Sequence, residues 1–326
     1  MTTPNTPAGD PVISYADVKA ATGRIAGLTR PVTVVAADAG ELGAADGWFA
    51  YEFTQHTGSF KARGAANFTA AHVEAGDMPD AGVVIASGGN AGLACAWAAR
   101  RRGVDATVFL PENAPAVKVA KLRSLGADIH QVGTEYATAL EASRRYAADS
   151  GAILSHAYDN PLIAAGAGTL LEEIHSALPT LDTVVVAVGG GGLFAGVAAA
   201  AHEYGVRVVA VEPEHSRALN ASIEAGRPVD VPVDSVAADS LGARRASAAA
   251  LDWALRTDCV SVLVPDSAIV TARQDLWDQR KLAVEHAAST ALAAIRTGAY
   301  TPADGERVCV VLCGANTDPG DLTRAT

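Results

Sequence analysis

The feature that most limits the fold is a series of largely apolar runs, each the length of a strand, that alternate with helical patterns. These runs cover residues 82–86, 105–110, 183–188, 207–211 and 307–312. The first two are followed by helical patterns that end at Gly103 and Gly126, and glycine is the usual residue just after a helix. Apolar strands that alternate with helices form parallel sheets covered on both faces. The sequence therefore predicts a doubly wound α/β fold.

Length, charge and cysteine content narrow the class of protein. The chain has 326 residues, of which 49% are hydrophobic, so about two domains with large cores are expected. A net charge of −11 disfavours nucleic acid or a membrane surface as a partner, because both select for basic patches. The four cysteines form no CxxC pair, and the N-terminus has no signal-peptide pattern. These features predict a cytoplasmic protein without a membrane span, whose first ten or so residues are disordered.

Three loops follow predicted strands and are candidates for binding. They are SGGN (residues 87–90), GGGG (residues 189–192) and CGAN (residues 313–316). In a doubly wound sheet, ligands bind beyond the carboxyl ends of the strands. We therefore expect these three loops to lie at one edge and to carry the chemistry.

The four-glycine loop connects an apolar strand to an apolar helix, an arrangement that favours phosphate, because backbone N–H groups and the positive helix end both face the anion. A tight turn without a ligand is the alternative. The same residues match a dinucleotide-binding pattern at Gly190, Gly192 and Ala195, and Glu212 ends the next strand. An NAD-dependent oxidoreductase, with Glu212 on the ribose, is therefore a second hypothesis.

The other two loops carry weaker signals. The hydroxyl of Ser87 and the backbone N–H groups of its loop could hold the carboxylate of an amino acid, and Asn90 offers an amide. An ordinary loop is the alternative. Cys313 ends a strand, where a free cysteine is by default a small buried hydrophobic residue.

A lysine in an unusual place is the fourth signal. In GSFKARGA (residues 58–65), Ser59 fits a helix N-cap, so Lys61 falls in the first turn. The helix dipole disfavours a cation there. Taken alone, an exposed lysine without a role remains open. An amine, a phosphate loop, a carboxylate-sized turn and a neutral thiol at one sheet edge together suit pyridoxal 5'-phosphate.

Seven motifs carry a family resemblance over nearly the whole chain from Tyr51 onward. They are EFTQHTGSFKARGA, ASGGNAG, HAYDNPLIAAGAGTLLEEI, VAVGGGGL, VEP, VEHAAS and LCGAN. With them the chain resembles the fold type II pyridoxal-phosphate enzymes, in particular the serine/threonine dehydratase and serine racemase group. The resemblance implies a tryptophan synthase β-like fold of two doubly wound domains with the cofactor in the cleft between them. Residues 1–82 and 157–326 would form the large domain, and residues 83–156 a small inserted domain.

The resemblance also implies site residues. Lys61 would be the catalytic residue and would carry the Schiff base. The implied cofactor-binding residues are Phe60 against the pyridine ring, Lys61, Asn90 at the 3'-oxygen, Gly189, Gly190, Gly191, Gly192 and Leu193 around the phosphate, and Cys313 facing the pyridine nitrogen. The implied substrate-binding residues are Ser87, Gly88, Asn90 and Ala91.

The implied reaction is elimination of water from L-threonine and/or L-serine, giving a 2-keto acid and ammonia, in a homodimer. Four departures from the family pattern matter. Gly88 replaces a serine of the racemases, Ala218 replaces an acidic residue of a metal site, Ser240 replaces a glycine, and His286 replaces a proline. We therefore expect slow racemisation and no bound metal. Serine racemase, a dehydratase of 3-hydroxyaspartate or phenylserine, and a non-catalytic amino-acid or cofactor-binding regulator stay open.

Overall fold

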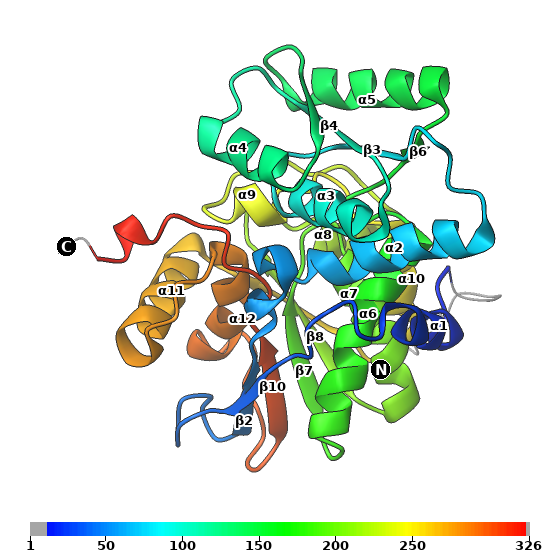
Figure 1. The fold of residues 1–326 in the computed structure, drawn as a ribbon. Helices are drawn as coiled ribbons and strands as arrows, with labels where there is room; N and C mark the ends of the chain where they lie inside the picture. Colours follow the sequence, from blue (N-terminus) through cyan, green and yellow to red (C-terminus); the bar gives the residue numbers. More distant parts are fainter. Residues whose placement is uncertain (1–11, 324–326) are drawn as a thin grey trace.

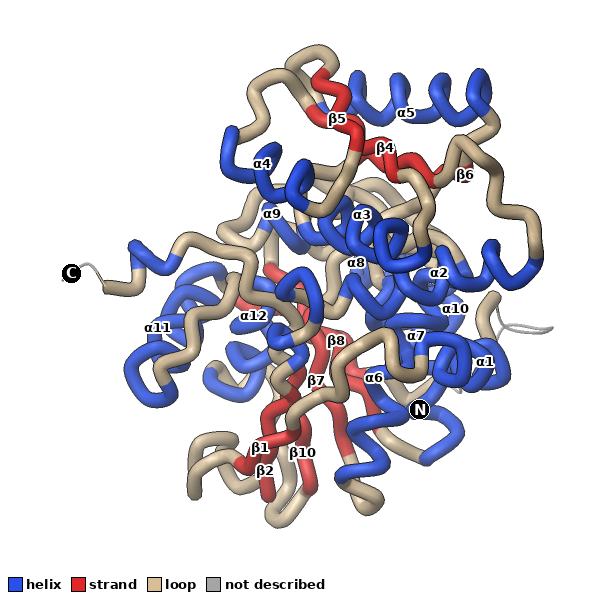
Figure 2. The backbone as a smooth tube through the Cα atoms, viewed as in Figure 1, coloured by secondary structure: helices blue, strands red, loops and turns tan. Residues whose placement is uncertain are grey.

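The computed structural model describes residues 12–323, whose strands form two separate sheets (Figures 1 and 2). The predicted disorder of the first residues falls outside this range. The larger sheet has the order β1-β2-β10-β7-β8-β9 and the smaller one the order β5-β4-β3-β6. The strands of the larger sheet are β1 (Val34–Ala36), β2 (Asp46–Ala50), β7 (Thr183–Ala187), β8 (Arg207–Pro213), β9 (Val260–Val264) and β10 (Arg307–Val311). Those of the smaller sheet are β3 (Val83–Ala86), β4 (Ala106–Leu110), β5 (Asp128–Gln131) and β6 (Ile153–Leu154).

Helices cover both sheets, as predicted for a doubly wound fold (Figure 1). The helices before β7 are α1 (Tyr15–Ile25), α2 (Lys61–Ala75), α3 (Asn90–Arg102), α4 (Ala116–Ser124), α5 (Tyr136–Ser150) and α6 (Pro161–Ala177). Those after β7 are α7 (Gly192–Tyr204), α8 (Ala218–Ala225), α9 (Ala238–Leu241), α10 (Ala248–Arg256), α11 (Asp266–Arg280) and α12 (His286–Arg296). Short 3₁₀ helices are η1 (Glu52–Thr54), η2 (His56–Gly58) and η3 (Pro319–Asp321). Within residues 12–323, no helix is both long and apolar enough to cross a membrane.

The strands of both sheets run parallel to their neighbours with one exception. Every strand pair is parallel except β1 with β2, which is antiparallel. Only residues 37–45 connect these two strands, which is too short for the helical crossover that a parallel pair requires. The strands predicted from the sequence all pair in parallel, and β1 is an additional antiparallel strand at the edge of the larger sheet.

The placement of the strands bears on the predicted domain split. The four strands of the smaller sheet all lie between residues 83 and 154, and those of the larger sheet lie outside this range. In Figure 1 the smaller sheet, with α4 and α5, occupies the upper part of the molecule and the larger sheet the lower part. This arrangement supports the proposed large and small domains, whose boundaries we keep as a proposal.

Glycines allow the central helices to approach closely. A Cβ on Gly64 of α2 would lie 2.6 Å from the carbonyl oxygen of Ile163 in α6, and one on Gly166 would lie 2.8 Å from Gly64 Cα. On the other side of α6, a Cβ on Gly168 would overlap the backbone of Gly196 in α7. Backbone packing of α2, α6 and α7 at these points fixes the position from which α2 presents its first turn.

The start of α2 differs from the prediction in its cap. Lys61 lies in the first turn as expected, but the flanking residue is Phe60, and no side chain caps the helix. The buried hydroxyl of Ser59 has no hydrogen-bond partner, so its assignment as the N-cap is wrong. Ser59 is extended and instead forms a β-bridge with Gly314.

Candidate active site

All of the predicted site residues line one cavity of about 730 Å³. The loops after β3, β7 and β10 contribute to its wall, together with Phe60 and Lys61 at the start of α2. The structure therefore brings together the segments that the sequence singled out, although they come from distant parts of the chain. Their individual binding roles remain predictions.

The amine of Lys61 lies at the cavity wall, and its pKa is lower than that of an ordinary lysine. Its Nζ donates a hydrogen bond of 2.7 Å to the carbonyl oxygen of Ala157 and lies 4.7 Å from the centroid of the Phe60 ring. Burial lowers the pKa of the Lys61 amine to about 8, against the opposing influence of Cys313 and Glu285. A substantial fraction of this amine is therefore neutral near pH 8.

Backbone pairing brings Cys313 close to Lys61. The N–H of Phe60 donates to the carbonyl oxygen of Cys313 at 3.0 Å, and the N–H of Ala315 donates to that of Gly58 at 2.9 Å. The thiol is buried, and this burial raises its pKa. Cys313 therefore stays a neutral thiol at the cavity wall.

The glycine loop after β7 forms a cradle of backbone atoms. Gly191, with a φ of 88°, precedes the first residue of α7. A Cβ on Gly190 would overlap the Tyr158 ring, and one on Gly191 would overlap Ala250. Because the first N–H groups of a helix have no partner within it, this cradle can bind an anion.

The loop after β3 offers a second set of unpaired N–H groups at the start of α3. The N–H of Gly89 donates to Ser87 Oγ at 3.3 Å. A Cβ on Gly92 would overlap the carbonyl oxygen of Ser87, so the turn can close only with glycine there. The first turn of α3 thus meets the cavity as a second site for a small anion.

His156 and Tyr158 line the cavity although no role was predicted for them. The backbone N–H groups of Tyr158 and Asp159 donate to His156 Nδ1 at 3.2 and 2.8 Å. Nδ1 is therefore an acceptor, and the ring proton lies on Nε2. Burial lowers the pKa of His156, which favours the neutral ring. The motif HAYDNPL contains both residues, but a motif alone does not tell which of its side chains face a cavity.

Glu285 is a third cavity residue without a predicted role. Its side chain is buried, and Asn90 Nδ2 donates to both carboxylate oxygens at 3.0 and 3.1 Å. Burial raises the pKa of Glu285 to about 7. A buried carboxyl group with this pKa, next to Lys61 and Asn90, is part of the electrostatic setting of the site.

Glu212 lies apart from the cavity, contrary to the dinucleotide hypothesis. It is fully buried, and its carboxylate accepts hydrogen bonds from the N–H groups of Leu219 and Asn220 at 2.8 and 2.7 Å. These bonds cap α8, so the carboxylate is not available to a ribose. Within residues 12–323, no group of three or more His, Cys, Asp or Glu side chains is arranged to hold a metal ion.

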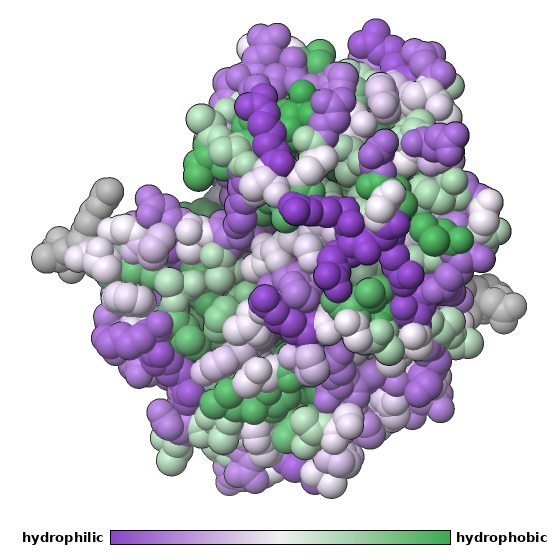
Figure 3. All heavy atoms as spheres, in the orientation of Figure 1, coloured by the Kyte–Doolittle hydropathy of each residue, from purple (hydrophilic) through white to green (hydrophobic). Residues whose placement is uncertain are grey.

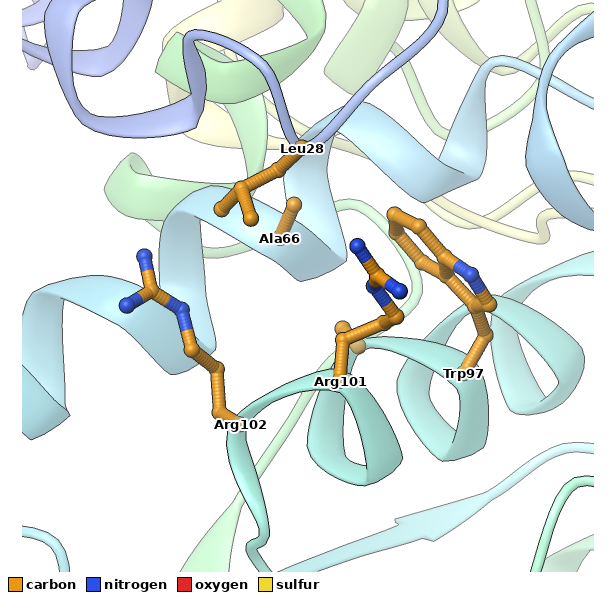
Figure 4. A pocket seen from close by; sticks show the side chains of 6 residues that line it. Leu28, Ala66, Trp97, Arg101 and Arg102 are labelled. Carbon is orange, nitrogen blue, oxygen red and sulfur yellow. The ribbon is translucent and has the colours of Figure 1, made fainter.

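A second recess lies between α2, α3 and the segment after α1 (Figure 4). It is lined by Leu28, Ala66, Trp97, Ala98, Arg101 and Arg102. Its interior leaves no volume for a water molecule, so it is a surface depression and not a ligand site.

Hydrophilic side chains gather over the middle of the face in Figure 3, where the upper and lower parts of the molecule meet.

Known proteins share both sequence and fold with this chain. The family model described as pyridoxal-phosphate dependent enzyme matches residues 26–314. A serine dehydratase-like protein of Mus musculus is 36% identical over 82% of this chain and 84% of its own length. An L-threonine ammonia-lyase of Geobacter sulfurreducens is 35% identical over 83% of this chain and 67% of its own length. The structure of maize serine racemase superposes with a TM-score of 0.88, covering 95% of each chain at 29% identity.

These matches confirm the predicted fold type and the predicted cofactor, pyridoxal 5'-phosphate. Together with the buried position of Glu212, they contradict the NAD-dependent alternative. The chain belongs to the family of pyridoxal-phosphate dependent enzymes.

Proposed function

We propose that this enzyme eliminates water from a β-hydroxy amino acid, L-threonine and/or L-serine, to give a 2-keto acid and ammonia. The observation that carries the proposal is a partly buried amine of lowered pKa, that of Lys61, in a cavity with two anion-binding helix starts. The likeness to a serine dehydratase-like protein and to an L-threonine ammonia-lyase supports the same reaction.

The residues of the cavity fit pyridoxal phosphate. Gly190 and Gly191 lie where any side chain would collide with Tyr158 or Ala250, so the backbone of residues 189–193 can approach and hold the phosphate. Phe60 offers a ring face, and Cys313 a neutral thiol toward the ring nitrogen. When bound, the cofactor supplies an aldehyde that takes up an amino group and a ring that withdraws electrons from Cα.

Lys61 then acts on the substrate. Its amine would remove the Cα proton of the substrate, which requires the neutral form that its lowered pKa provides. The carbonyl oxygen of Ala157 accepts one N–H of the amine and so helps to orient it. The hydroxyl leaves Cβ as water by taking up one proton, which balances the proton removed from Cα. A water molecule later hydrolyses the product imine to the 2-keto acid and ammonia.

The start of α3 orients the substrate. We infer that Ser87, Gly88, Asn90 and Ala91 bind its α-carboxylate, because this turn presents unpaired N–H groups to the cavity. Cys313 favours elimination, since a neutral thiol gives little support to a protonated pyridine ring.

Racemisation of serine is the second candidate, supported by the likeness to maize serine racemase. A racemase needs an acid on the face of the substrate opposite its base. Gly88 leaves no hydroxyl at the place where the resembling racemases have one. We therefore place racemisation below elimination.

The test compares wild type with Lys61→Ala. Formation of 2-keto acid from L-threonine and L-serine should be lost in the variant, and borohydride reduction followed by peptide mass spectrometry should locate the cofactor on Lys61 of wild type only. Lys19→Ala, which changes an exposed lysine of α1, is the control and should keep both properties. Substantial turnover by Lys61→Ala would contradict the proposal.

A further inference from the structure

Two side-chain amides and one carboxylate form a hydrogen-bonded chain that ends at the cavity. Asn316 Nδ2 donates to the carbonyl oxygen of Thr57 at 2.6 Å and to Asn90 Oδ1 at 2.8 Å. Lys121 Nζ donates to Asn316 Oδ1 at 2.6 Å. Asn90 Nδ2 in turn donates to the carboxylate of Glu285.

The outer partners fix the orientation of both amides. A backbone carbonyl can only accept, and a lysine ammonium group can only donate. Asn316 must therefore turn its Nδ2 toward Thr57 and its Oδ1 toward Lys121. Its remaining N–H then requires an acceptor in Asn90, which must present Oδ1 to Asn316 and Nδ2 to Glu285.

The backbone around this chain leaves room for it. A Cβ on Gly58 would lie 3.0 Å from Asn316 Oδ1, and one on Gly314 would overlap the carboxylate of Glu285. Gly58 also has a φ of 76°, which disfavours a larger residue. The two loops therefore enclose the amides closely.

This geometry fixes which side of the Asn90 amide faces each neighbour. Its Oδ1 faces Asn316, and the near-equal distances from Nδ2 to the two oxygens of one carboxylate describe one N–H shared between them. The second N–H remains for the cavity that Asn90 lines. Asn90 therefore turns an N–H toward the cavity, while its Oδ1 faces Asn316.

We propose that Asn316 is a positioning residue that orients the amide of Asn90 so that its N–H donates to an anionic oxygen in the cavity. This inference rests on the proposed function, since the oxygen belongs either to the bound cofactor or to the carboxylate of the amino-acid substrate. Asn316 itself does not line the cavity and acts only through Asn90.

The experiment uses the holoenzyme of wild type, Asn316→Leu and Asn316→Asp. A hydrogen bond donated to an anionic oxygen lowers the pKa of that group. If the oxygen belongs to the cofactor, the pH midpoint of the visible absorption spectrum without substrate should rise by about one unit in both variants. If it belongs to the substrate, KM should rise about tenfold, with a smaller change in kcat and an unchanged spectrum.

Three controls separate the orientation of the Asn90 amide from an effect of added charge and from loss of the contact between Asn316 and α4. Asn316→Leu adds no charge, so a shift seen only in Asn316→Asp would be an effect of charge and would overturn the inference. Lys121→Ala removes the contact to α4 and keeps the bonds of Asn316 to Thr57 and Asn90, so it should behave as wild type. Asn220→Leu, which removes an amide bonded to Arg217 and Ser261 outside the cavity, should also behave as wild type.

The outcomes are distinct from those that test the function. Unchanged spectrum and unchanged KM in Asn316→Leu would overturn the positioning role while leaving the proposed elimination intact. Should Asn316→Leu not retain the cofactor, the smaller Asn316→Ser takes its place under the same criteria. A wild-type protein that binds no pyridoxal phosphate would overturn the proposed function, and this inference with it. The titratable groups on the nearby cavity wall, Lys61, Glu285 and Cys313, are unchanged in every variant.

Discussion

Lys61 contacts the cavity from the first turn of α2, and burial of its amine sets the pH at which it can react. Because the pKa is lowered to about 8, the neutral form predominates above that pH. The rate at which apoenzyme takes up pyridoxal phosphate should therefore rise about tenfold per pH unit below 8 and level off above it. Stopped-flow absorbance measures this rate.

Glu285 provides the matched variant for that measurement. Its carboxylate raises the pKa of Lys61, so Glu285→Gln should move the midpoint of the uptake rate to lower pH. A midpoint near the ordinary lysine value of 10.5 in wild type would show that burial does not govern this amine.

Gly88 allows a direct test of what limits racemisation. A Cβ there would meet only the flexible end of Leu110, at 3.0 Å, so Gly88→Ser should fold. Its hydroxyl would provide a proton donor on the far face of the substrate, and formation of D-serine from L-serine should increase by about tenfold or more. Chiral chromatography measures the product, and Gly88→Ala is the control without a hydroxyl. Equal D-serine formation by both variants would refute the explanation.

The residues predicted from the sequence lie in a loop after a predicted strand, as Asn90 and Cys313 do, or in the first turn of a predicted helix, as Lys61 does. Lys61, Asn90 and Cys313 line the cavity as expected. Glu285 and His156 were not predicted, because Glu285 follows no strand and His156 follows β6, a strand of two residues that the sequence analysis did not identify. The roles of the predicted residues stay predictions until their variants are measured.

Helices α2 and α6 are joined by a buried ion network that also supports the site. Arg63, fully buried and two residues after Lys61, donates to Glu52 at 2.7 and 3.0 Å and to Glu173 at 2.7 and 2.8 Å. Arg63→Met would leave these carboxylates without their cation and should lower the free energy of unfolding by about 3–5 kcal/mol. Urea denaturation measures the change.

The pair of Lys19 with Glu172, in which only the lysine is exposed, is the comparison for that variant. Lys19→Met should unfold close to wild type, because water screens the exposed ammonium group and Tyr204 still donates to Glu172. An Arg63→Met protein as stable as wild type would mean that the network contributes specificity and little stability.

Helix α8 and strand β8 contain the positions at which the family pattern places a metal site. Glu212 uses both carboxylate oxygens to cap α8, and the nearby acid of the family pattern is replaced by Ala218. Too few oxygen ligands remain there for Mg²⁺ or Ca²⁺. Treatment with a chelator should therefore change the elimination rate less than twofold, as measured before and after dialysis against EDTA. A large loss that added Mg²⁺ restores would contradict this prediction.

Strands were predictable from the sequence where they are buried on both faces. The runs at β3, β4, β7, β8 and β10 gave strands within a residue or two of the expected bounds. The edge strands β1, β5, β6 and β9 were not recognised, because each of them is short, partly exposed or both. Strand β2, with the sequence DGWFA, begins with two residues typical of turns.

For the molecule as a whole, the sequence predicted two domains with a cleft between them, but it did not predict the dimensions of the cleft. The cavity wall is made by segments near residues 60, 90, 157, 190, 285 and 313, and their spacing depends on backbone packing at Gly64, Gly166 and Gly196. No local pattern encodes such distances. The predicted homodimer and cytoplasmic location stay predictions, to be tested by sedimentation and by cell fractionation.

Strand β10 lies between β2 and β7, although both of these neighbours precede it in the chain by many residues. During synthesis on the ribosome, the centre of the larger sheet is therefore still open when most of the chain has emerged. Cys313 and Asn316 follow β10 directly, so the cavity is completed by the same late event. A nascent chain interrupted before β10 cannot assemble this wall of the cofactor site, which makes loading of the cofactor a step that follows translation of this segment.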